Sequence, residues 1–186
     1  MARYTDKKAA RYCNEVLKCA REWMKDKPDL HTAWEDNFGR TFVCDGFRAY
    51  RLEKRPNGLE EIWTVHVHKE TKAERERRER VHNGIEAMFD GNILENMAPV
   101  PVEYADVMTA YKTSEDWTMD LGEDFPVVNV KYLRQAMEML PGAKVYCQDN
   151  ARRMVSPVYV ISENGVALIL PIRRENKLHW TYRKGA

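Results

Sequence analysis

The sequence has no long apolar run, and none of its hydrophobic stretches approaches the roughly 20 residues that a membrane-spanning helix needs. Its first residues, MARYTDKKAARYC, are polar and lack the apolar block of a signal peptide. There are only four cysteines, Cys13, Cys19, Cys44 and Cys147, and no two of them form a CxxC pair. These absences disfavour a membrane partner, a disulfide scaffold and a zinc cluster, and they predict a cytoplasmic protein with reduced thiols.

The sequence also offers few candidates for catalysis or metal binding. It contains no GxSxG, P-loop, GxGxxG or HExxH motif. His66 and His68 alternate along a predicted strand, so both would point to one face, but no further ligand stands at a convincing spacing. We therefore expect no catalytic residue, no metal and no cofactor. An enzyme that uses the His66 and His68 face stays open as an alternative.

The net charge of +1 conceals two basic ends around an acidic middle. Residues 1–28 carry eight Lys and Arg against four acids, and residues 127–186 carry ten against four. Residues 86–126 hold ten acids and a single base, Lys112. A basic face of this kind is compatible with phosphate binding, although most such faces are only solvated surface.

Two amphipathic segments predict helices, and three strands are predicted after each. Apolar residues recur at helical spacing over residues 6–25 and over residues 130–140, the second segment being capped by Asn129 and stopped by Pro141-Gly142. Turn residues then delimit strands at 30–36, 40–52 and 59–68, and again at 143–148, 154–162 and 166–172. The pattern predicts a single α+β domain built from two half-repeats, with the helices on one side of an antiparallel sheet.

The remaining segments connect or follow these half-repeats, which span residues 1–68 and 127–174. The mixed-charge segment from residue 69 predicts an exposed helix, either a solvated protrusion or a nucleic-acid-binding arm. Residues 96–108 are typical of an extended connector, and the acidic residues 113–125 of a loop. We interpret residues 69–126 as a connection that carries an insertion, and residues 175–186 as a basic tail.

Two stretches resemble the bacterial sliding clamp, the beta subunit of DNA polymerase III. VCDGFRAYRL, residues 43–52, resembles the (V/A)TDGHRLA segment of that family, and ALILPIRR, residues 167–174, stands in the place of its closing YVVMPMRL strand. The helix-plus-three-strands unit used twice is also how one clamp domain is built. The resemblance, over residues 1–68 and 125–174, implies a DNA-clamp-like fold and a non-catalytic processivity accessory protein of the kind a phage or mobile element encodes.

The resemblance implies two binding surfaces. In clamps, the two motifs line a pocket for short peptides of replication and repair proteins, with glycine letting the backbone bend beneath it. The matching residues here are Cys44, Gly46, Phe47, Arg48, Ala49, Leu168, Leu170, Pro171, Ile172 and Arg173. Clamp helices also meet the phosphates of double-stranded DNA without reading bases. The residues expected to do so here are Lys8, Arg11, Lys18, Arg21, Lys131 and Arg134.

Several departures from the family leave alternatives open. Cys44 replaces Thr, Phe47 replaces His, and the chain is long enough for one clamp domain only, so a peptide pocket would form between the subunits of a homo-oligomer. Alternatively, Asp45-Gly46 is a shaped turn and residues 166–172 a buried strand. A clamp-fold interaction module without DNA binding is the other alternative function. Because an unpaired arginine is costly to bury, we expect residues 46–48 and 170–172 to be exposed.

Overall fold

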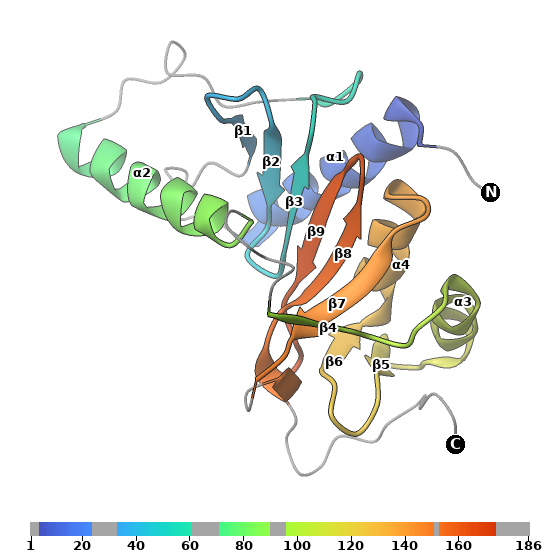
Figure 1. The fold of residues 1–186 in the computed structure, drawn as a ribbon. Helices are drawn as coiled ribbons and strands as arrows, with labels where there is room; N and C mark the ends of the chain where they lie inside the picture. Colours follow the sequence, from blue (N-terminus) through green and yellow to red (C-terminus); the bar gives the residue numbers. More distant parts are fainter. Residues whose placement is uncertain (1–3, 24–32, 61–70, 90–95, 151–152, 174–186) are drawn as a thin grey trace. The chain divides into compact units, whose positions relative to one another are not determined.

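The chain forms two compact units. The computed structural model describes residues 4–23, 33–60, 71–89, 96–150 and 153–173. The N-terminal unit spans residues 5–93, and the C-terminal unit spans residues 94–186 together with residues 1–4. Both units combine helices with antiparallel strands (Figure 1), which confirms the predicted α+β class.

The N-terminal unit contains a meander of three antiparallel strands. Its elements are α1 (Asp6–Trp23), β1 (Ala33–Glu35), β2 (Thr41–Cys44), β3 (Arg48–Leu52) and α2 (Lys72–Ala87). β2 pairs with β1 on one side and with β3 on the other, so the run predicted over residues 40–52, with its interruption at Asp45-Gly46, forms two strands that meet at this turn. The strand predicted at 59–68 falls mostly outside the described residues.

The first helix buries the stripe that its sequence predicts. Seven of its residues are at most 5 % exposed: Ala9, Ala10, Tyr12, Cys13, Val16, Leu17 and Ala20. They cover the face of the meander that carries Val43 and Tyr50, both fully buried. A turn braces the helix from outside, where Asn57 Nδ2 donates to Asp6 Oδ2 at 3.0 Å and Asn14 Nδ2 donates to the Gly58 carbonyl at 2.9 Å.

The second helix covers the opposite face of the same meander. Trp34 of β1 stacks on His82 with ring centroids 3.9 Å apart, and its Nε1 donates to Glu86 Oε1 at 2.7 Å. Because side chains alternate along a strand, Trp34 and its cross-strand partner Phe42 point away from the α1 face. In the N-terminal unit helices therefore lie on both faces of the strands, with α1 on one face and α2, from the predicted insertion, on the other.

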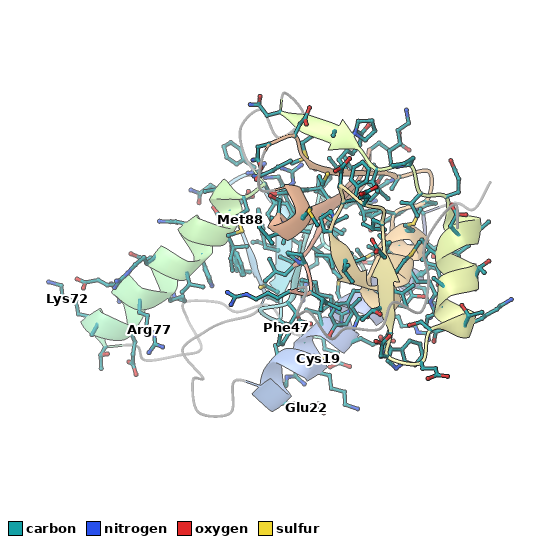
Figure 2. The ribbon with its side chains drawn as sticks, turned by 90° about the horizontal axis from the view of Figure 1, so that it is seen from below. Cys19, Glu22, Phe47, Lys72, Arg77 and Met88 are labelled. Carbon is teal, nitrogen blue, oxygen red and sulfur yellow. The ribbon has the colours of Figure 1, made fainter. Side chains whose placement is uncertain are left out.

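Only the C-terminal half of α2 packs in this way. Thr71 caps the helix in a capping box with Glu74, and residues 71–77 are all exposed. Figure 2 shows Lys72 at the projecting end and Met88 at the end near the strands. The prediction of an exposed charged helix is confirmed for these first turns, whereas the later turns are anchored through Trp34.

The C-terminal unit contains a second meander and a small hairpin. Its strands β4 (Met97–Pro99), β7 (Lys144–Gln148), β8 (Val158–Ser162) and β9 (Gly165–Ile169) are antiparallel neighbours in the order β9-β8-β7-β4. β5 (Thr118–Asp120) pairs with β6 (Val127–Asn129). Its helices are α3 (Tyr104–Thr113), α4 (Val130–Met139) and a short 3-10 turn, η1 (Arg153–Val155). Each unit thus has a helix followed by three antiparallel strands; the three after α4 match the predicted ones, whereas β2 and β3 of the N-terminal unit both come from the run predicted at 40–52.

The second predicted helix begins and ends where its sequence indicates. Asn129 Oδ1 accepts from the amides of Lys131 and Tyr132, and Gly142 takes the left-handed φ of +76° that ends the helix. Its buried face does not follow the apolar residues of its sequence alone. Gln135 and Met139 are buried, whereas Tyr132 and Met137 are only half-buried.

Two segments of the predicted connection are regular elements. The expected connector ends in α3, with Val107 and Ala110 fully buried, and the expected acidic loop contains β5, with Met119 fully buried. The predictions of an extended connector and of a loop were wrong there, because these apolar residues pack inside the C-terminal unit. Most of the acids around them are at least partly exposed, but Asp120 of β5 is buried. The side-by-side packing expected of residues 6–25 and 130–140 stays a prediction.

Candidate nucleic-acid interface and the two clamp-like motifs

The Asp45-Gly46 break is a hairpin turn organised by one carboxylate. Asp45 Oδ1 accepts from the amides of Phe47 and Arg48, both at 3.0 Å, and Oδ2 pairs with Arg48 Nε at 3.0 Å. Gly46 adopts a φ of +87°, which a side chain would strain. One aspartate thus closes the turn and neutralises the arginine three residues later.

Arg48 lies inside the protein, so its predicted exposure is wrong. Its side chain is 1 % exposed and that of Asp45 is fully buried. The guanidinium also donates to Tyr50 Oη at 3.3 Å and contacts Cys19 Sγ of α1 at 4.0 Å. The pairing with Asp45 offsets the cost of burying the Arg48 charge. These contacts favour the alternative reading of Asp45-Gly46 as a shaped turn.

The thiols and the phenol around this turn stay protonated. Burial raises the pKa of Cys13 to about 12, against an opposing effect of Arg48, and burial raises the pKa of Cys44 to about 11. Burial likewise raises the pKa of Tyr50. A nucleophile needs a lowered pKa and access to solvent. Cys13 and Cys44 therefore act as packing residues.

The rest of the first motif is divided between interior and surface. Ala49 is buried and Cys44 half-buried, whereas Gly46 is exposed and Phe47 is 39 % exposed. In Figure 2 Phe47 lies near Cys19 at the end of α1 that carries Glu22. Phe47 is thus the large apolar side chain of this motif that reaches the surface.

The second motif leaves the sheet as it reaches the surface. Leu168 is buried in β9, and Leu170 just beyond it is 39 % exposed. Ile172 is half-buried, and its amide donates to the Val127 carbonyl at 2.8 Å, which ties this segment to β6. Pro171 is half-buried and Arg173 exposed. The expected exposure of residues 170–172 is therefore met at Leu170 and only partly at the next two positions. The two motifs belong to different units, and a shared pocket stays a prediction.

A row of cations runs along the outer face of α1. Arg11, Lys18 and Arg21 are exposed, while Lys8 at the edge of the row is half-buried. Lys7 extends the row, since it is exposed and stands four residues before Arg11. The sequence prediction omitted Lys7, although its i,i+4 spacing was the signal.

The ion pairs in this row are weak. Arg11 Nε lies 3.7 Å from Glu15 Oε1, and an Arg21 guanidinium nitrogen lies 3.8 Å from Glu60 Oε2. The arginine side chains remain 68 % and 55 % exposed. Exposed pairs at such distances contribute little stability and exchange readily for another anion. The cations can therefore reach a phosphate without disturbing the fold.

The predicted cations of α4 behave differently from one another. Lys131 is exposed. Arg134 is held against α3, with its guanidinium carbon 3.9 Å from the centre of the Tyr111 ring and its Nε 3.4 Å from Glu138 Oε1. The prediction that Arg134 points away from neighbouring elements was wrong. Its charge is engaged inside the C-terminal unit, which leaves Lys131 as the accessible cation of this helix.

The described part of the chain offers no other site of recognisable chemistry. Within it, no three His, Cys, Asp or Glu side chains are grouped to hold a metal ion, and no helix is long and apolar enough to cross a membrane. His66 and His68 lie outside the described residues.

Comparisons with known proteins return no match. No family model, no curated protein and no solved structure is similar to this chain. The resemblance to sliding clamps therefore depends on the two short motifs and on the repeated helix-and-meander construction. A functional proposal must come from the surfaces themselves.

Proposed function

We propose that this chain is a non-catalytic accessory protein that binds double-stranded DNA through α1 without reading its sequence. One observation supports this proposal most strongly. α1 buries one complete face in the N-terminal unit and presents Lys7, Arg11, Lys18 and Arg21 on the other. The construction from a helix and a meander also resembles that of a sliding-clamp domain, in which helices meet the phosphates of DNA.

The geometry of the row suits a phosphate backbone. Lys7 and Arg21 are fourteen residues apart, so the row is roughly 21 Å long at the helical rise of about 1.5 Å per residue. Contacts of lysine and arginine to phosphate supply affinity and position but no base discrimination. The expected binding is weak, independent of sequence and sensitive to salt.

Charge reversal on α1 tests this proposal. A variant with Arg11, Lys18 and Arg21 all changed to Glu should lose binding to a labelled duplex, as measured by fluorescence anisotropy at low salt. The matched control reverses Lys72, Arg77 and Arg80, three exposed cations of the projecting helix α2. The control should bind almost as the wild type does, and circular dichroism should show that both variants are folded.

The opposite pattern would contradict the proposal. If the α1 variant binds as the wild type does and the α2 control loses binding, DNA meets the projecting helix instead. If neither variant binds less tightly, the interface uses neither helix.

A role in binding replication or repair proteins is the second candidate. It is favoured by the exposure of Phe47 and Leu170, apolar residues within the two clamp-like motifs. A clamp-binding peptide bearing Leu or Phe should then bind with micromolar affinity, about −8 kcal/mol. Phe47→Ala and Ile172→Asp should each abolish this binding in calorimetry. Arg48→Ala would not test the pocket, since it removes a buried structural charge.

A further inference from the structure

Trp117 is displayed at the surface in a backbone conformation that tryptophan rarely adopts. Its φ is +61°, and it is the sole non-glycine with positive φ among the described residues. Its side chain is nevertheless 42 % exposed. Left-handed backbone is costly for a bulky residue, and such outliers cluster at binding sites. Glycine would adopt this backbone conformation without strain, so the presence of a tryptophan side chain here needs a reason other than the backbone.

The turn that carries Trp117 is firmly built. Asp116 Oδ1 accepts from Thr118 Oγ1 at 2.7 Å, from the Thr118 amide at 3.2 Å and from Ser114 Oγ at 3.1 Å. The hydrogen bond from the Thr118 side chain is the main cause that lowers the pKa of Asp116, so the carboxylate stays ionised. The Trp117 carbonyl accepts from the Val130 amide at 2.8 Å, where α4 begins. The backbone at Trp117 is therefore held in place from both sides.

Trp117 adjoins a cluster of aromatic and guanidinium groups, with its ring tilted by 45° to that of Tyr111. Its ring lies 5.0 Å from that of Tyr111, and the Arg134 guanidinium lies 3.9 Å over the Tyr111 ring. Glu138 faces Arg134 at 3.4 Å and accepts from Tyr104 Oη at 2.8 Å. The protein thus already contains one guanidinium paired with an aromatic face and a carboxylate. Trp117 and its exposed neighbour Glu115 present the same two kinds of group to solvent.

The charge around Trp117 indicates which class of ligand this surface favours. Residues 103–124 contain seven acids, all but the buried Asp120 at least partly exposed, and one base, Lys112. A nucleic-acid backbone would be repelled there, although aromatic rings alone would suit a base. A cation would be attracted by the carboxylates and by the electron-rich ring faces.

We infer that Trp117, with Tyr111 and Glu115, forms a docking surface for an arginine-rich polypeptide segment of a partner protein. An incoming guanidinium stacks on Trp117 as Arg134 stacks on Tyr111, and Glu115 pairs with its charge. This surface belongs to the C-terminal unit and does not depend on the proposed binding of DNA by α1.

A peptide titration tests the inference on the full chain. The probe is a fluorescein-labelled dodecapeptide of alternating glycine and arginine, with a lysine version and a glutamate version as comparisons. The arginine peptide should bind tightest and the glutamate peptide should not bind. Trp117→Ala should weaken binding on the order of tenfold. Trp117→Gly, which suits the backbone, should do the same if the alanine variant folds poorly.

Phe38→Ala is the matched control, because Phe38 is an aromatic residue of the N-terminal unit that is 82 % exposed. It should leave the affinity for the peptide unchanged. In a proton–nitrogen NMR spectrum, the indole signal that disappears in Trp117→Ala should be the one that shifts when wild-type protein is titrated with the peptide.

Three results would overturn the inference. One is equal affinity of the wild type and both Trp117 variants for the arginine peptide, which would mean that acidic residues attract the peptide without any role of Trp117. Another is an unmoved Trp117 indole signal during saturation with the peptide. The third is a Trp117-dependent affinity for oligo(dT) greater than that for the arginine peptide, which would assign the surface to single-stranded nucleic acid.

Discussion

Asp45→Asn should destabilise the protein far more than its conservative appearance suggests. The amide oxygen can still accept from the Phe47 and Arg48 amides, which lie 3.0 Å from Asp45 Oδ1, so the turn itself is retained. The group opposite Arg48 Nε, however, is no longer an anion. Tyr50 Oη, the hydroxyl partner of Arg48, is neutral because burial raises its pKa. The buried arginine then loses the charge of its Asp45 partner.

The expected magnitude follows from the burial of this pair. With the side chains 1 % and 0 % exposed, removing one partner should lower the free energy of unfolding by about 3–5 kcal/mol. Adding Arg48→Met should recover at least part of this loss, because it removes the charge that Asp45 no longer balances. A double-mutant cycle on Asp45 and Arg48 would then show strong coupling.

Urea unfolding followed by circular dichroism provides the measurement, with the midpoints compared at equal slope. Glu53→Gln is the control, since Glu53 pairs with Arg51 at 3.3 Å but is 47 % exposed. It should cost no more than about 1 kcal/mol. Equal and small losses for Asp45→Asn and Glu53→Gln would refute the view that a buried ion pair organises this turn.

Three further predictions concern stability. Asn129→Ala removes the acceptor that caps α4 and should cost about 1 kcal/mol in urea unfolding, whereas an unchanged midpoint would mean that the cap is dispensable. Trp117→Gly should be more stable than Trp117→Ala by about 1 kcal/mol, because only alanine strains the positive φ; equal stabilities would argue against the left-handed backbone. Cys13 has a pKa of about 12 when folded, above that of an unfolded thiol. The protonated Cys13 thiol therefore contributes its full stability below about pH 9. Between about pH 9 and 12 only the unfolded thiol ionises, so the free energy of unfolding should fall by up to about 1.4 kcal/mol per pH unit. Denaturation at a series of pH values should show a shallower alkaline loss in Cys13→Ala, and an identical profile would contradict the assignment.

The sequence predicted best what depends on local periodicity and capping. The buried stripe of α1 and the Asn129 cap of α4 were both correct, because each is determined within one or two helical turns. The charged α2 was also found from its composition. Its anchoring through Trp34 and His82, however, depends on residues 48 positions apart, a contact that no local pattern contains.

The errors share a physical cause. Arg48 was expected outside because a charge is costly to bury, yet Asp45 three residues earlier neutralises it. Arg134 was expected to be accessible because it stands on the polar side of a helix, but Tyr111 of α3 covers it. The short β5 was hidden among acids because strands of three residues provide too little alternation to detect. In each case a partner decided the outcome: Asp45 of the same turn for Arg48, α3 for Arg134 and β6 for β5.

The contribution of the exposed α1 cations to DNA binding can be measured directly from the salt dependence of that binding. For a duplex held by Lys7, Arg11, Lys18 and Arg21, the logarithm of the binding constant should fall with the logarithm of salt concentration with a slope of about −3.6. Replacing Lys18 with Ala should make that slope shallower by about 0.9, equally for duplexes of unrelated sequence. A slope near zero, or one that Lys18→Ala leaves unchanged, would contradict DNA binding through this helix.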